Sequence, residues 1–337
     1  MKGKIIMLKG PNEMELRDYD VKAPAADEIV VRNELSAISA GTERANIAAM
    51  PNTVLRFNRS FGYNSVGTVI DKGDAVKNFE IGDRVIVFFG GGHRSHSVCK
   101  EKHLCKIPDN VSFEDASMVI IGGFGLEGAR RTRLEIGESG MVVGCGILGL
   151  FACQCLKIMG GVPVIAIDFN RERLAIAKEL GADYVFTPDE PDLKKKILDI
   201  TDGKGINAAV EVTGSAKALR QTLEMMARRG RIALTGCTRI SDEPIDFYKL
   251  VHCPGVELLG GHTSVRPEHD SMPGIWTPHD DHRTLLKLIG AGRLKVAPII
   301  SGKVSPETVS ETYGKIVNDP NPPLGVLFDW TMLGLDN

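Results

Sequence analysis

Short segments in which hydrophobic and polar residues alternate dominate the chain up to about residue 112. Segments 27–39, 65–73 and 82–89 are rich in Val and Ile and are separated by Lys-Gly and Gly-Asp turns, and 95–112 has the pattern of a strand pair. Alternation of this length predicts half-buried β-strands. Segment 1–20 has a short apolar run followed by acidic residues, so we expect a first strand rather than a signal peptide. A compact, mostly β region is therefore predicted.

A different pattern starts after about residue 120. Segment 139–161 reads as an apolar strand, a glycine-rich turn and a helix, and further helices are expected at 171–182 and 215–227. Strands that alternate with helices predict parallel βαβ units. The other strands of this region are expected within 163–170, 183–186, 206–214, 228–236 and 256–262.

The alternation ends after His262. Segment 264–276 contains Pro and Gly and is expected to be a loop. Segment 277–292 is expected to be a helix, because Thr277 suits the cap, Pro278 suits the first turn, and two aspartates follow near the positive end of the dipole.

Composition and charge exclude several classes of protein. The chain has 337 residues, 43% of them hydrophobic and 25% charged, with a net charge of −2. Without a surplus of positive charge, nucleic acid is not an expected partner. No apolar run is long enough to cross a membrane. The seven cysteines are scattered and odd in number, which favours a reducing cytoplasm.

The motif G-x-G-x-x-G supplies the first chemical hypothesis. Gly144, Gly146 and Gly149 stand between an apolar strand and a helix, and the next strand ends at Asp168, nineteen residues after Gly149. This arrangement is typical of a dinucleotide site, in which the helix N-terminus binds the pyrophosphate and the carboxylate binds the ribose hydroxyls. A carboxylate repels a 2′-phosphate, so NAD is predicted in preference to NADP. Arg173 either reaches the adenosine ribose or is solvated.

Blocks of recognisable sequence recur along nearly the whole chain. They are 38–43 (ISAGTE), 62–69 (GYNSVGTV), 81–85 (IGDRV), 104–117 (LCKIPDNVSFEDAS), 144–150 (GCGILGL), 166–183 (AIDFNRERLAIAKELGAD), 211–214 (EVTG), 230–236 (GRIALTG) and 292–294 (GRL). In order and spacing they resemble the medium-chain dehydrogenase/reductase superfamily, in its alcohol and polyol dehydrogenase branch. The resemblance implies an α/β protein with a GroES-like catalytic domain formed by 1–123 and 263–337, a Rossmann domain at 124–262, and an active site in the cleft between them. It also implies a homodimer or homotetramer. Further cofactor-binding residues implied by the resemblance are Ile147, Leu148, Val212, Thr213, Gly236, Gly261 and His262.

The zinc ligands of the family are replaced in this chain. Ala40 stands in place of the Cys, and Tyr63 and Asn64 stand in place of the His and Glu of the family motif. Gly122 or Gly123 falls where the last ligand would be, and the four-cysteine lobe is missing. Since none of these residues offers a group that binds zinc, we expect no metal. The crowding of His and Cys between residues 93 and 105 is a possible new zinc site, but strand alternation disfavours it.

Side chains must then handle the proton that accompanies hydride transfer. Tyr63 is the first candidate, with His93 and Glu43 as alternatives and Thr42 as a relay that the resemblance implies. For the first three, a pocket-lining, loop or structural role stays open. Candidate substrate residues are Arg94 and, in the loop after His262, Arg266 and Trp276; that loop is equally suited to an oligomer contact.

The predicted function is a zinc-independent, NAD-dependent dehydrogenase. Its small-molecule substrate would carry a secondary hydroxyl group and would be a sugar, polyol or cyclitol derivative. One alternative is an enzyme that retains NAD and uses transient oxidation for elimination or epimerisation. Another is a non-catalytic NAD sensor or structural protein.

Overall fold

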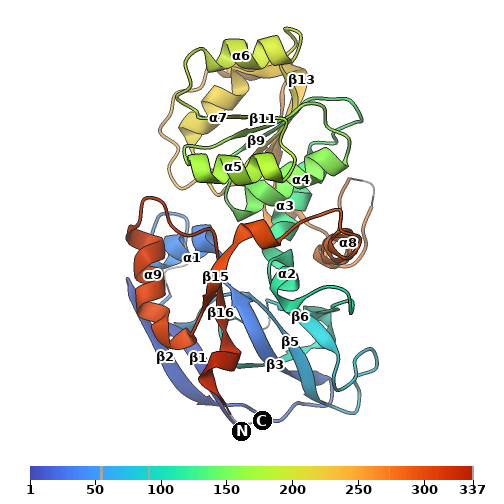
Figure 1. Cartoon of the computed structure of the whole chain (residues 1–337), viewed down its shortest axis with the longest axis vertical. Coiled ribbons are helices and arrows are strands. Elements are labelled where there is room, and N and C mark those ends of the chain that lie inside the picture. Colours follow the sequence, from blue (N-terminus) through green and yellow to red (C-terminus); the bar gives the residue numbers. More distant parts are fainter. Residues whose placement is uncertain (54–55, 90–91, 273, 336–337) are drawn as a thin grey trace. The chain divides into compact units, whose positions relative to one another are not determined.

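The computed structural model describes residues 1–53, 56–89, 92–272 and 274–335. The chain divides into two compact units (Figure 1). Unit 1 comprises Met1–Ile120, Leu286–Gly292 and Val296–Asn337, and unit 2 comprises Ile121–Leu285 and Arg293–Lys295. The α/β class expected from the sequence is confirmed, with a β-rich unit and a doubly wound unit.

The domain boundaries differ from those expected at 123/124 and 262/263. The structure keeps 263–285 in unit 2. The physical reason is local: Arg266 and Asp281 form buried ion pairs with residues of α3 (Val119–Arg131), which fasten this segment to unit 2.

Unit 1 is built mostly on antiparallel strands, and β15 and β16 pair in parallel. One sheet has the order β15-β16-β3-β5-β6-β8, with β7 also paired to β3, and a second sheet has the order β2-β1-β4. Its helices and strands are β1 (Lys2–Gly10), β2 (Glu13–Asp20), β3 (Glu28–Ala37), α1 (Ala40–Ile47), β4 (Arg59–Ser60), β5 (Asn64–Lys72), β6 (Arg84–Phe88), β7 (His96–Lys100), β8 (Leu104–Lys106), α2 (Phe113–Ser117), β15 (Ile300–Val304), α9 (Val309–Asn318) and β16 (Gly325–Asp329).

Apolar cores formed by the described residues stabilise unit 1. Alternate residues of β3, β5 and β6 form the first core, as period-2 patterning requires, and its buried members include Val31, Val69 and Val85. The second core lies where α1 and α9 pack on β1 and β16, and it includes Ile47 and Phe328. The second core also surrounds the polar cluster described below.

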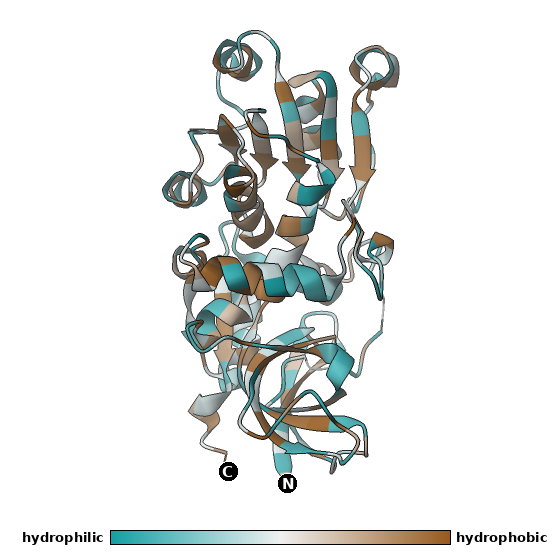
Figure 2. Ribbon diagram, turned by 90° about the vertical axis from the view of Figure 1, so that its right-hand side faces the viewer, coloured by the Kyte–Doolittle hydropathy of each residue, from teal (hydrophilic) through white to brown (hydrophobic). Residues whose placement is uncertain are grey.

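Unit 2 is a parallel sheet flanked by helices. The strand order is β11-β10-β9-β12-β13-β14, and every neighbouring pair is parallel. The central strands carry mostly hydrophobic residues (Figure 2) because both of their faces are covered. The elements are β9 (Gly140–Val143), α4 (Ile147–Ile158), β10 (Val164–Ile167), α5 (Arg171–Glu179), β11 (Tyr184–Phe186), α6 (Leu193–Ile200), β12 (Ile206–Glu211), α7 (Ala216–Leu223), β13 (Met226–Leu234) and β14 (Glu257–Gly260). Helix α8 (Pro278–Gly290) begins in unit 2, and its residues from Leu286 onward belong to unit 1.

The two faces of this sheet bury different helices. Met141 and Ile165 point to the face where Ile197 of α6 and Leu223 of α7 complete an apolar core. On the other face, α4 packs closely enough that a Cβ added at Gly149 would lie 3.2 Å from Val142. Among the described residues, no helix is both long and apolar enough to cross a membrane.

Candidate active site

Tyr63 lies directly before β5, with its ring half-buried beside Phe89. The two rings stack with centroids 5.9 Å apart and planes inclined by 17°. The Tyr63 Oη donates a hydrogen bond of 2.6 Å to Ser39 Oγ. The ring of Tyr63 is therefore held by stacking on Phe89, and its hydroxyl is held by the hydrogen bond to Ser39.

Ser39 occupies the N-terminal cap position of α1 but does not cap it in the usual way. Its side chain accepts no hydrogen bond from the described N–H groups of this helix. Instead, the backbone N–H of Ser39 donates to Glu43 Oε1 at 3.0 Å. Glu43, four residues after the cap, thus binds the cap N–H and stabilises the start of α1, and the Ser39 hydroxyl bonds Tyr63 instead.

Glu43 belongs to a buried polar cluster whose members come from distant parts of unit 1. Tyr313 Oη donates to Glu43 Oε2 at 2.5 Å, and His93 Nε2 lies 3.2 Å from the same oxygen. On its other side, His93 Nδ1 lies 2.7 Å from Ser36 Oγ, which also accepts from Trp330 Nε1 at 2.9 Å. Ser36 can then donate its own proton to His93 Nδ1, and His93 Nε2–H can donate to Glu43. We call Ser36, Ser39, Glu43, His93, Tyr313 and Trp330 the Glu43 cluster.

Burial decides the role of two of the expected catalytic residues. Glu43 is 1% exposed and His93 is 0% exposed. Burial and the adjacent Glu43 carboxylate raise the pKa of Tyr313 well above its ordinary value. A buried carboxylate with three donors is stabilised in place. The structure thus brings Glu43 and His93 together, as hydrogen-bond partners inside unit 1.

The other two polar candidates of unit 1 are placed differently. Thr42 is exposed on α1, and its carbonyl accepts from Asn46 Nδ2 at 2.7 Å. Arg94 follows His93 and lies beside Tyr19 and the Cys99 thiol, where burial lowers its pKa. Since successive side chains of an extended segment point to opposite sides, the Arg94 side chain lies away from His93.

The positions that bind zinc in the family contain other chemistry here. Asn64 is buried, and its Oδ1 accepts from Ala37 N at 3.2 Å. Burial raises the pKa of the Cys99 thiol to about 12, so it is a packing residue. Among the residues that the structure describes, no group of three or more His, Cys, Asp or Glu is arranged to hold a metal ion.

The glycine-rich turn of unit 2 has the geometry of a dinucleotide cradle. Gly144 has a φ of +97°, and a Cβ at Gly149 would lie 1.8 Å from Gly144 O. A Cβ at Gly146 would meet nothing within 4 Å, so this glycine leaves open space at the start of α4. The N–H groups of Ile147 and Leu148 in the first turn of α4 lack intrahelical acceptors. They and the helix dipole can bind a pyrophosphate.

Asp168 follows β10 and is held in place by two backbone donors. Cys145 N donates to its Oδ2 at 2.6 Å and Asn170 N to its Oδ1 at 2.7 Å. Asn170 in turn caps α5 by accepting from Glu172 N and Arg173 N. The carboxylate is thus fixed beside the glycine-rich turn, where it can accept from ribose hydroxyls.

The remaining expected cofactor residues also lie at the carboxyl ends of strands. After β12, the buried Glu211 carboxylate accepts from Thr213 N at 2.7 Å and Gly214 N at 3.1 Å, which shapes the turn that contains Val212. Burial raises the pKa of Glu211. After β13, a Cβ at Gly236 would lie 2.3 Å from Gly214 N. These turns meet at one edge of the sheet, which is where nucleotides bind in such folds.

The turn after β14 completes this edge. Gly261 is buried, and His262 is exposed with its Nδ1 2.8 Å from Ser264 Oγ. A short 3-10 helix, Thr263–Val265, then connects His262 to Arg266. The structure therefore brings the expected cofactor residues of unit 2 to one side of the sheet.

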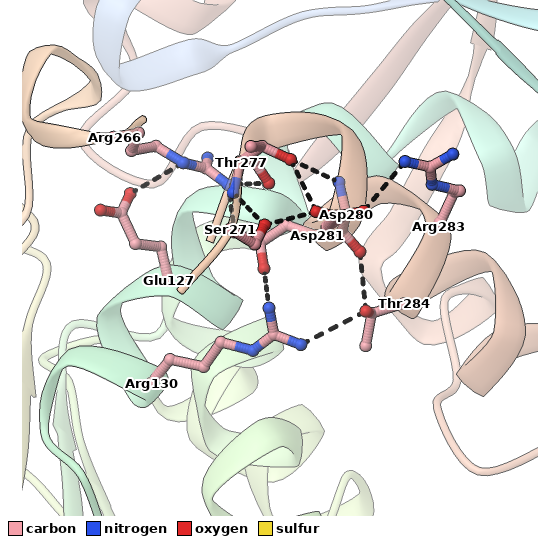
Figure 3. Close-up of polar contacts among 9 residues, drawn as sticks. All are labelled: Glu127, Arg130, Arg266, Ser271, Thr277, Asp280, Asp281, Arg283 and Thr284. Carbon is pink, nitrogen blue, oxygen red and sulfur yellow. Dashed lines mark hydrogen bonds and ion pairs between the residues drawn. The ribbon is translucent and has the colours of Figure 1, made fainter. Parts of the chain in front are cut away.

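Arg266 forms buried ion pairs with Glu127 of α3 and Asp281 of α8 (Figure 3), and Trp276 packs on Arg130 of α3. The Arg266 guanidinium, 8% exposed, hydrogen-bonds Asp281 and lies 3.5 Å from Glu127 Oε2. Arg130 bonds the other Asp281 oxygen, and its Cζ lies 4.0 Å from the Trp276 ring centroid. These contacts occupy the Arg266 charge and argue against its expected contact with substrate.

The buried ion pairs around Arg266 predict an effect of pH on the free energy of unfolding. Burial raises the pKa of Glu127 to about 7 from 4.5, with Arg266 opposing the shift. Because the folded protein binds the proton of the Glu127 carboxyl more tightly than the unfolded chain does, this proton stabilises the fold at low pH. That stabilisation is lost as pH rises from about 4.5 to about 7. Between about pH 5 and pH 8, the wild type should lose on the order of 1–2 kcal/mol relative to Glu127→Gln. Urea unfolding at each pH measures this, and two parallel stability curves would disprove it.

Several structural residues were missed by sequence reasoning. Tyr313, Trp330 and Ser36 carry no local motif, and only the fold brings them to Glu43. Ser39 had a signal, since a Ser before a helix predicts a cap. Asp281 was expected only to favour the helix dipole, although it binds two arginines.

The fold and the glycine-rich turn resemble those of the medium-chain dehydrogenase/reductase superfamily, and the named relatives, which are dehydrogenases, identify the chain as an oxidoreductase. The family model described as zinc-binding dehydrogenase matches residues 148–270. L-threonine 3-dehydrogenase of Pyrococcus furiosus is 27% identical over 321 residues, covering 86% of this chain and 87% of the relative. Sorbitol dehydrogenase of Bacillus subtilis is 28% identical over 242 residues, covering 59% and 69%.

Solved structures share the fold over nearly the whole chain. An Escherichia coli oxidoreductase/dehydrogenase of unknown specificity has a TM-score of 0.86 at 20% identity and covers 98% of this chain and 99% of its own. A Sinorhizobium meliloti protein bound to NADP has a TM-score of 0.82 at 18% identity, with the same coverage. An E. coli alcohol dehydrogenase complexed with NADH has a TM-score of 0.83 at 19% identity, again with 98% and 99% covered.

Proposed function

We propose that this protein is a zinc-independent, NAD-dependent dehydrogenase that oxidises a secondary hydroxyl group of a sugar, polyol or cyclitol derivative. The observation that carries the proposal is the combination of an intact dinucleotide cradle with a hydrogen-bonded phenol, Tyr63, at a family metal-ligand position. The curated relatives named for L-threonine and sorbitol support a hydroxyl-bearing substrate.

The preference for NAD rests on Asp168. Related folds have been solved with NADH and with NADP, so the fold alone does not select between them. A fixed carboxylate accepts both ribose hydroxyls of NAD and repels the 2′-phosphate of NADP. The backbone N–H donors of Cys145 and Asn170 hold the carboxylate in place beside the glycine-rich turn.

In the proposed reaction, the cofactor, Tyr63 and the residues that bind the cofactor each have one role. Bound NAD⁺ supplies the acceptor for the hydride that leaves the substrate carbon. Tyr63, as a phenolate, accepts the proton that leaves the substrate oxygen, so the products are a ketone, NADH and a phenol. The phenol then returns its proton to solvent. Asp168 and the first turn of α4 bind and orient the cofactor.

A substrate panel tests this proposal. Purified protein should form NADH with NAD⁺ and at least one secondary alcohol among sugars, polyols and cyclitols, and should form far less NADPH with NADP⁺. Tight NAD⁺ binding without turnover across the panel would contradict the proposal and favour a sensor. Conversion of a substrate without net NADH would favour an enzyme that recycles the cofactor within one turnover.

A further inference from the structure

The Ser39 hydroxyl is positioned for a task other than helix capping. It stands at the cap of α1, where a serine side chain commonly accepts from the N–H groups of the first turn. In this structure it accepts instead from Tyr63 Oη, at 2.6 Å, while Glu43 takes the cap N–H. Ser39 is 4% exposed, so water does not compete strongly for its hydroxyl.

A hydroxyl is suited to a partner that gains and loses a proton, because it both accepts and donates. We propose that Ser39 is a positioning residue for Tyr63 that accepts from the phenol and, by rotating its own O–H, donates to the phenolate. This inference rests on the proposed function, in which Tyr63 takes the substrate proton. A donor to the charged form lowers the pKa of an acid, so Ser39 makes the phenolate accessible at lower pH.

The Glu43 cluster fixes the place of this hydroxyl. The Ser39 backbone is held by Glu43, which is held by His93 and Tyr313. These three titratable groups come from α1, from the segment before β7 and from α9, and they are the charged or titratable members of the cluster around Ser39. The negative charge of Glu43 disfavours a nearby phenolate, which makes a local donor to Tyr63 more important.

Two different substitutions remove the Ser39 hydroxyl, so a folding defect in one does not prevent the test. Ser39→Ala removes it directly, and Ser39→Gly removes it with a residue that is well tolerated at a helix cap. Ser39→Thr keeps a hydroxyl and serves as the rescue. Ser112→Ala is the matched control, because Ser112 caps α2 in the same unit by accepting from Asp115 N at 3.0 Å.

The first readout is the pH profile of kcat for alcohol oxidation. We expect Ser39→Ala and Ser39→Gly to move its midpoint upward by about half to one pH unit and to lower the rate below the midpoint about three- to tenfold. Ser39→Thr should restore most of this shift. Ser112→Ala should lower stability and leave the midpoint unchanged. If Ser39 has only a structural role, its variants should likewise lower stability and leave the midpoint unchanged.

The second readout does not need activity. The ultraviolet absorbance of the Tyr63 phenolate is obtained as the difference between titrations of each protein and its Tyr63→Phe counterpart. The same upward shift is expected when Ser39 is replaced by Ala or Gly. An unchanged Tyr63 titration in both variants would overturn the inference. If Tyr63→Phe is instead almost fully active, the proposed function fails, and the absorbance titration still decides what Ser39 does.

Discussion

Replacing Tyr63 with Phe is expected to lower kcat for alcohol oxidation by about 10²–10⁴-fold, the usual contribution of a general acid or base. The substitution keeps the ring and its stacking on Phe89, so it removes only the hydroxyl that bonds Ser39. The rise of the wild-type rate with pH through a single ionisation should disappear in this variant. Steady-state kinetics across pH, together with the melting temperature, measures the effect.

Cofactor affinity is the control for this variant. The substitution removes one hydroxyl from unit 1 and leaves the glycine-rich turn and Asp168 of unit 2 unchanged, so the Kd for NAD⁺ should stay nearly constant. A loss of less than about threefold in kcat would fall far below the range for a general base and would mean that Tyr63 only shapes its surroundings. Glu43→Gln and His93→Asn should mainly lower stability, because both side chains are buried in the Glu43 cluster.

Replacing Asp168 with Ser is expected to narrow the difference in binding free energy between NAD⁺ and NADP⁺ by roughly 1–3 kcal/mol, the scale of charge-assisted hydrogen bonds. The carboxylate should bond the ribose hydroxyls of NAD⁺ and repel the extra phosphate of NADP⁺. Measuring the Kd of both cofactors for wild type and variant determines the change.

Asp168→Asn separates charge from shape. The amide oxygen can still accept from Cys145 N or Asn170 N, so the turn is largely kept while the negative charge is removed. We expect this variant to bind NADP⁺ more tightly than the wild type does. Equal affinities of the wild type for the two cofactors would show that Asp168 does not select between them.

Local patterns predicted the nucleotide unit well. The strand before Gly144, the helix after Gly146 and the acidic residue after β10 lie within one βαβ unit, so their arrangement follows from short-range geometry. The role of Gly149 was also accessible, because a helix that starts at the end of its own strand must approach it closely.

The polar residues of unit 1 were harder to predict because their surroundings are built from distant segments. Glu43 and His93 resemble catalytic groups in the sequence, but Tyr313 bonds Glu43 and Phe328 packs against His93, both from far away in the chain. Burial of a charged side chain depends on such partners, and local periodicity carries no information about them.

Arg266 illustrates the same limit. A polar, Gly- and Pro-containing segment reads equally well as a binding loop or as a contact surface. Its two carboxylate partners come from different helices, Glu127 on α3 and Asp281 on α8. Only the tertiary structure shows that Arg266 holds the segment after His262 in place through ion pairs with these two carboxylates.

Metal content and activity measured on the same sample test the central claim most directly. After dialysis against a chelator, the protein should contain far less than one zinc ion per chain and should retain its rate of NAD⁺-dependent alcohol oxidation, because Ala40, Tyr63 and Asn64 offer no group suited to zinc. Loss of activity in proportion to the zinc removed, with recovery when zinc is returned, would contradict the account.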